Sequence, residues 1–123
     1  MTEMLIEMSL RLPAVRYRQS RMAAPDVRAL YLPDAAAAGP ADAFIDGHEF
    51  CHLHPPPEGG AHLTLPDAVR DRALELGWAE SHATVKAGAM PKSLVLVYAP
   101  RNTEELQSVL TLVRVSCQFA KGL

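Results

Sequence analysis

Several features that would define a class of protein are scarce in this sequence. Only two of its 123 residues are cysteines. Cys51 and Cys117 both stand inside apolar patterns, which argues against a disulfide scaffold and suits buried thiols in a reducing compartment. No run approaches the ~20 apolar residues that a membrane-spanning helix needs. The first thirteen residues contain Glu3 and Glu7 and lack the basic start and cleavage site of a signal peptide. We therefore expect a soluble cytoplasmic protein with no membrane partner.

An excess of charge of one sign is also lacking. The formal net charge is -2, so no strong basic field marks the whole molecule for binding to nucleic acid. Arg16, Arg18 and Arg21 form a local basic cluster, but their spacing on a strand is more typical of a solvated face. No glycine-rich loop fits a phosphate or a dinucleotide, and Gly59-Gly60 is typical of a hairpin turn. The sequence predicts neither a nucleic-acid partner nor an organic cofactor.

What is present suffices for one hydrophobic core. The chain is 49% hydrophobic and 21% charged, as in ordinary globular proteins, and its length fits one domain over residues 1–123. Apolar spacing and turn residues predict helices at 2–12, at 66–76 and from 102 onward, and strands at 15–22, 28–32, 43–55, 61–65, 78–86 and 93–100. This order predicts an α+β fold, a mostly antiparallel sheet with helices packed on one face.

The predicted hairpin from His48 to Thr64 is rich in histidine. Side chains alternate between the two faces of a strand. On the first strand, one face should therefore hold His48, Phe50, His52 and His54. On the returning strand His62 and Thr64 share a face. The apolar side chains of both strands must face the same core, and registers that allow this place His52 or His54 opposite His62.

This parity holds if both strands run without a bulge. Three imidazoles then converge on one face, with Phe50 and Thr64 beside them. Glu49 falls on the core-facing parity, so we expect it at an edge or paired with an arginine. Cys51 has no neighbour that would lower its pKa, and we expect it in the core.

Converging imidazoles support two kinds of chemistry. A histidine with a pKa near neutrality can take a proton from an acidic substrate while its neighbours orient it, with no cofactor. Alternatively, three ring nitrogens can bind zinc or iron, and the spacing from His52 to Glu58 resembles the first metal-binding motif of cupins, although their second motif is absent. In either case the candidate catalytic or metal-binding residues are His52, His54 and His62. Candidate substrate-binding residues near this face or at the ends of neighbouring strands are Phe50, Thr64, His48, His82 and Tyr98.

Three segments together resemble a known family. The run EFCHLHPPPEGGAHLTLP, the helix end GWAESH and the run LVLVYAPRNTEEL before a long last helix are similar to the luciferase-like domain named after the luciferase of bioluminescent fungi. The resemblance covers roughly the C-terminal two-thirds of the chain. The fungal enzyme looks like an oxygenase of a hydroxylated pyrone that needs no flavin. Most members have no known function, so the resemblance does not imply light emission, and no catalytic residues carry over.

The resemblance favours proton transfer over metal binding at the histidine face. Removing a proton from an acidic hydroxyl yields an electron-rich enolate, which can react with oxygen or cyclise without an organic cofactor. Such chemistry needs a base, a dry apolar pocket and hydrogen-bond donors for the anion. Our first hypothesis is therefore a cofactor-independent enzyme that oxygenates, cyclises or isomerises a small aromatic or polyketide-like metabolite.

Two other hypotheses stay open. One is a metal-dependent enzyme that uses the same histidines. The other is a non-catalytic ligand-binding or interaction domain, in which the contact of a homodimer covers the histidine face.

Overall fold

The computed structural model describes residues 1–20 and 26–123. The N-terminal half of the chain contains α1 (Thr2–Leu10), β1 (Arg16–Gln19), β2 (Arg28–Tyr31), the short 3-10 helix η1 (Ala41–Ala43) and β3 (Glu49–Leu53). The C-terminal half contains β4 (Ala61–Thr64), α2 (Asp67–Glu75), β5 (Ala79–Ser81), α3 (Ala83–Lys86), β6 (Leu94–Val97) and α4 (Thr103–Lys121). The predicted strand at 15–22 extends at its end into residues that lie outside the described ones.

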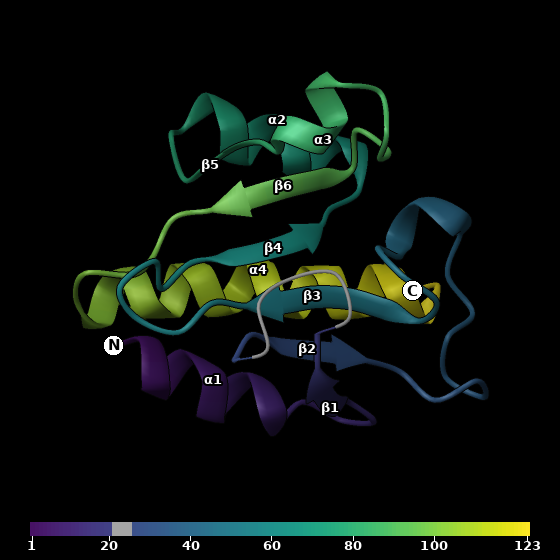
Figure 1. Cartoon of the computed structure of the whole chain (residues 1–123), viewed down its shortest axis with the longest axis horizontal. Helices are drawn as coiled ribbons and strands as arrows, with labels where there is room; N and C mark the ends of the chain where they lie inside the picture. Colours follow the sequence, from purple (N-terminus) through teal and green to yellow (C-terminus); the bar gives the residue numbers. More distant parts are fainter. Residues whose placement is uncertain (21–25) are drawn as a thin grey trace.

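The strands form one sheet in the order β1-β2-β3-β4-β6-β5, and every described pairing of neighbours is antiparallel. The long helix α4 crosses behind β3 and β4, and α1 lies beside it (Figure 1). The predicted α+β class and the mostly antiparallel sheet are confirmed. Within the described residues, no helix combines the length and the apolar character needed to cross a membrane.

Helix α4 supplies much of the core that supports the sheet. The side chain of Asn102 caps its first turn by accepting a hydrogen bond of 2.9 Å from the backbone N–H of Glu105, and Gly122 ends the helix in a left-handed conformation with φ of 82°. Its buried residues follow a helical stripe that includes Leu106, Val109, Leu110, Val113 and Cys117. Cys51 and Cys117 are free and buried, as the sequence predicts.

Two predicted strands are shorter than expected because turns interrupt them. The segment 43–55 begins with η1 and a turn in which Gly47 has a φ of +59°, so the strand starts at Glu49. The segment 78–86 pairs with β6 over three residues only. It then forms α3, because the ring nitrogen Nδ1 of His82 accepts a hydrogen bond from the N–H of Thr84 and caps that helix.

A β-bulge at Phe50 changes the predicted parity of the hairpin. Leu30 of β2 faces Cys51, and the next residue, Tyr31, faces Glu49, which leaves Phe50 without a partner on β2. An extra residue of this kind lets side chains that would alternate point to the same side. Phe50 is fully buried in the hydrophobic core, so the prediction that it lies on the histidine face is wrong. The bulge also turns Glu49 toward that face.

Candidate functional site

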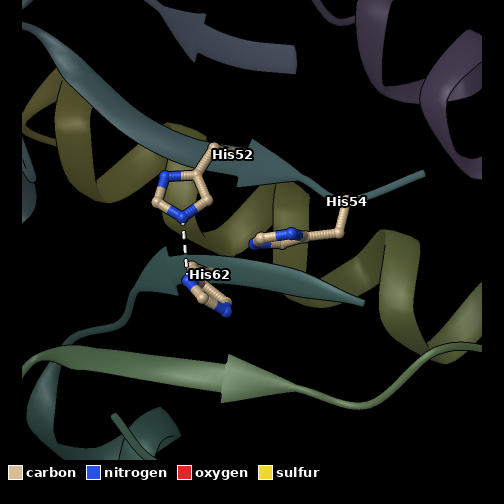
Figure 2. A group of neighbouring side chains, drawn as sticks. All are labelled: His52, His54 and His62. Carbon is tan, nitrogen blue, oxygen red and sulfur yellow. Dashed lines mark hydrogen bonds between the residues drawn. The ribbon is translucent and has the colours of Figure 1, made fainter. Parts of the chain in front are cut away.

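The centre of the candidate site is a pair of histidines on neighbouring strands. His52 of β3 lies directly opposite His62 of β4, and their ring nitrogens Nε2 and Nδ1 are 2.8 Å apart. His54 joins them, with its ring centroid 4.4 Å from that of His62 and 5.4 Å from that of His52. The three side chains lie on the side of the strands away from α4 (Figure 2). The structure therefore brings together the three histidines that the sequence predicts.

A carboxylate extends this pair into a chain of hydrogen bonds. Nδ1 of His52 lies 2.9 Å from Oε2 of Glu49, whose side chain is fully buried. A carboxylate only accepts hydrogen bonds, so Nδ1 of His52 carries the proton of this bond. Nε2 of His52 is then the acceptor for the Nδ1–H of His62. The second ring nitrogen of His62 points away from His52 (Figure 2), and in this tautomer it carries a lone pair.

An arginine whose spacing in the sequence is typical of a solvated face holds the Glu49 end of this chain of hydrogen bonds. Nη2 of Arg18 lies 3.4 Å from Oε1 of Glu49 and 3.5 Å from Oδ2 of Asp46. Arg18 and His52 stand in one row of the sheet, each paired with the small residue Ala29. The expectation that Glu49 pairs with an arginine is confirmed. The alternation of arginines on this strand was the only feature of the sequence that could have indicated a role for Arg18. Arg21, from the same basic cluster, lies outside the described residues.

A fourth histidine completes the cluster. The ring centroid of His82 lies 4.5 Å from that of His62, and the two rings meet edge to face. Since Nδ1 of His82 contacts the hydroxyl oxygen of Thr84 at 2.7 Å as well as its backbone N–H, the cap of α3 fixes the orientation of the ring. His82, predicted as a substrate-binding residue, thus stands beside His62.

Burial and mutual repulsion keep the imidazoles of His54, His62 and His82 neutral. Desolvation, followed by the neighbouring charges of His52, His54 and His82, lowers the pKa of His62 to about 3. The pKa of His54 is lowered mainly by desolvation and then by His52. The same two causes, in the same order, lower the pKa of His82. At neutral pH the rings therefore offer lone pairs, which a base or a metal ligand must do.

A small hollow opens onto the cluster. Its volume is about 140 Å³, and it is lined by His54, Glu58, Gly60, His62, Leu96, Val97, Tyr98 and Ala99. Tyr98 is 44% exposed. Partial desolvation, together with the charge of Glu80 and a hydrogen bond to it, raises the pKa of the Tyr98 hydroxyl, which stays protonated. The predicted residue Tyr98 therefore lies in the wall of the histidine hollow.

Comparison with known protein families identifies the region that carries this site. The family model described as the luciferase domain matches residues 47–116. The chain belongs to the luciferase-domain family. No curated protein and no solved structure matches it significantly.

The luciferase-domain match contains Glu49 and the four clustered histidines, but it does not contain Arg18. The arginine that holds Glu49 therefore comes from the part of the sheet that precedes the matched region.

Three predicted site residues do not join the cluster. Thr64 is fully buried and donates a hydrogen bond of 2.8 Å to the carbonyl oxygen of Ala43. Phe50 lies in the core because of the bulge. His48 lies in the turn just before β3, where its Nδ1 is 3.0 Å from a carboxylate oxygen of Asp34. The bulge moves Phe50 and the turn before β3 moves His48 away from the histidines, whereas Thr64 contacts Ala43 and Ser116 although β4 pairs regularly.

The same three histidines have the arrangement of a metal site. Nitrogen atoms of His52, His54 and His62 all lie within 4.8 Å of one another. Nε2 of His54 is buried and has no hydrogen-bond partner among the described residues. The carboxylate of Glu49 accepts a hydrogen bond from the far ring nitrogen of His52, as a carboxylate commonly does to orient a metal-binding histidine. Zinc bonds of roughly 2.0–2.1 Å would require the contact between His52 and His62 to open and His54 to approach.

Proposed function

We propose that this luciferase-domain protein is an enzyme that removes a proton from a small aromatic or polyketide-like metabolite. Neutral histidines perform this step without an organic cofactor, and the resulting anion is oxygenated, cyclised or isomerised. The observation that carries the proposal is the unbroken hydrogen-bond chain from Glu49 through His52 to His62, which ends at a hollow.

This chain of hydrogen bonds explains how a weakly basic His62 can act as the base. The substrate proton is transferred to the free Nε2 of His62 while the Nδ1 proton of His62 passes to Nε2 of His52. The positive charge then rests on His52, beside the buried carboxylate of Glu49, which stabilises it. This division of roles follows the logic of carboxylate-supported histidine bases in other enzymes.

The surroundings of His62 suit an anionic product. Leu96 adds apolar surface to the wall of the hollow, and the hydroxyl of Tyr98 in the same wall, which is hydrogen-bonded to Glu80, has to leave that partner to donate to the anion. Exclusion of water strengthens electrostatic interactions with a developing charge. His54 stands beside both His62 and His52, in a position to orient the reacting group.

Substitution of single histidines tests this proposal. Hydroxylated pyrones and phenols are offered as substrates, and product formation is followed with oxygen consumption. We expect His52→Ala, His54→Ala and His62→Ala each to lower kcat/KM, with His62→Ala costing roughly 10²-fold or more. His48→Ala is the matched control, since that histidine pairs with Asp34 outside the cluster. Full activity in all three cluster variants would refute the proposal.

A second candidate function is metal-dependent catalysis by the same residues, favoured by the unpartnered buried nitrogen of His54. Protein purified without a histidine tag is analysed for zinc and iron, before and after incubation with each ion. Bound metal near one ion per chain that is lost in His54→Ala, together with activity that a chelator removes, would favour this candidate. Metal content near zero after incubation would exclude it.

A further inference from the structure

The histidine hollow has a carboxylate in its wall as well as imidazoles. Glu58 lines the hollow together with His54 and His62, and it belongs to the loop that joins β3 to β4. Its side chain is exposed and makes no hydrogen bond or ion pair with another described residue. A ligand in the hollow therefore has no partner to displace from this carboxylate.

The carboxylate of Glu58 lies close enough to His54 to act on its ring. Desolvation and then the charge of His52 lower the pKa of His54, and the charge of Glu58 partly opposes them. Nε2 of His54 is buried and has no hydrogen-bond partner among the described residues. Since buried polar atoms rarely stay unpaired without an ion or a water, a free nitrogen beside a carboxylate favours a bound cation.

The other two histidines differ in which ring nitrogens are free. Nδ1 of His52 contacts Glu49 at 2.9 Å and its Nε2 contacts His62 at 2.8 Å, so both nitrogens are engaged. Nε2 of His62 points away from His52 (Figure 2) and carries a lone pair in the tautomer that Glu49 imposes. His62 can therefore bind an ion while its contact with His52 stays closed, whereas His52 has to give up a hydrogen bond.

Two imidazoles and one carboxylate are a common ligand set for divalent transition-metal ions. Catalytic zinc is held by two histidines and a glutamate in some hydrolases, and non-haem iron(II) by two histidines and a carboxylate. Such an ion keeps water at its remaining positions. A water molecule takes up about 30 Å³ in the liquid, so a hollow of about 140 Å³ has room for the ion and its waters.

We propose that the histidine hollow binds a divalent zinc or iron ion through Nε2 of His54, Nε2 of His62 and the carboxylate of Glu58. Compared with the three-histidine arrangement, Glu58 takes the place of His52 as a ligand. His52 instead orients His62 from behind, as hydrogen-bond partners of metal-binding histidines commonly do. The ion uses the lone pair that the proposed base needs, so metal binding and proton transfer at His62 exclude each other.

Isothermal titration of protein without a histidine tag tests for the site, with Zn²⁺ and, in the absence of oxygen, with Fe²⁺. We expect one ion per chain. Glu58→Gln should raise the dissociation constant at least about tenfold, because losing even a group that orients a ligand costs about 10–100-fold. Glu104→Gln removes the same charge at the exposed start of α4 and should change it by less than about twofold. Absence of binding for both ions, or equal effects of the two variants, would overturn the site.

Long-range ¹H–¹⁵N spectra of the zinc-loaded protein identify the ligands directly. We expect Nε2 of His54 and Nε2 of His62 to take the shifts of metal-bound nitrogens, while Nδ1 of His62 keeps its proton. A metal-bound nitrogen on His52 would overturn the proposal and assign the ion to the three histidines. Neither measurement uses a substrate, so fully active histidine variants would refute the proposed catalysis and leave these binding results unchanged.

Discussion

Replacing Glu49 by glutamine probes the direction of the hydrogen-bond chain with almost no change in shape. In the native protein the carboxylate accepts a hydrogen bond from Nδ1–H of His52 and another from Nη2 of Arg18 with its other oxygen. A glutamine has one acceptor and one donor end. Arg18 offers only donors, so the amide oxygen turns to Arg18 and the amide NH₂ turns to His52.

This orientation reverses the tautomers along the chain. Nδ1 of His52 then has to accept a hydrogen bond, its Nε2 carries the proton, and Nδ1 of His62 accepts a hydrogen bond from that N–H at the 2.8 Å contact. The outer nitrogen of His62 becomes an N–H and can no longer take a proton from a substrate. We expect kcat/KM to fall by roughly 10²-fold or more, although the native residues around it stay in place.

The accompanying loss of stability should be modest. A hydrogen bond to a charged group contributes about 1.5–3 kcal/mol and a neutral one about 0.5–1.5 kcal/mol, so Glu49→Gln should cost about 1–2 kcal/mol. Arg18 keeps Asp46 at 3.5 Å. Glu75→Gln is the matched control, because its ion pair with Arg72 is exposed and should contribute at most about 1 kcal/mol.

Two measurements decide this prediction. Long-range ¹H–¹⁵N spectra distinguish protonated from lone-pair ring nitrogens and reveal the tautomers of His52 and His62 without any substrate. Urea unfolding supplies the change in the free energy of unfolding. An unchanged proton on Nδ1 of His52 in the variant, or unchanged turnover, would refute the reasoning.

Three further predictions concern His62 and its support. The pKa of His62 falls from 6.5 in the unfolded chain to about 3 in the folded protein, beside the imidazoles of His52, His54 and His82. As the pH falls, the unfolded state therefore binds a proton at His62 before the folded state does. The free energy of unfolding is unaffected by this group above pH 6.5 and decreases as the pH falls from 6.5 toward 3. Urea midpoints at pH 7 and 4.5 should differ less in His62→Gln, and an equal difference would contradict this. Ser116→Ala removes the hydroxyl that donates to the Phe50 carbonyl at 3.3 Å and should lower the free energy of unfolding by about 1 kcal/mol, whereas a neutral result would show that the bulge needs no support from α4. Gly60→Ala would bring a Cβ to 2.6 Å from the carbonyl oxygen of Val97, so we expect a clear drop in Tm and reduced turnover, and native values for both would be evidence against tight packing of β4 on β6.

The sequence alone was sufficient for the centre of the candidate site. The alternation of side chains and the need to bury Cys51 and Leu53 determined that His52, His54 and His62 converge, since both constraints act locally along two neighbouring strands. The observed register, with His52 opposite His62, is one of those predicted. The apolar stripe of the last helix likewise identified its core-facing side before any contact was known.

Only the tertiary structure decided which groups surround these histidines. Period-two parity fails wherever a bulge inserts a residue, and Phe50 takes its place in the core at the cost of a regular ladder with β2. That single irregularity turns Glu49 toward His52. Arg18 reaches Glu49 from 31 residues away in sequence, and His82 reaches His62 through the cap of α3. Such contacts depend on how distant segments pack, which no local pattern of side chains encodes.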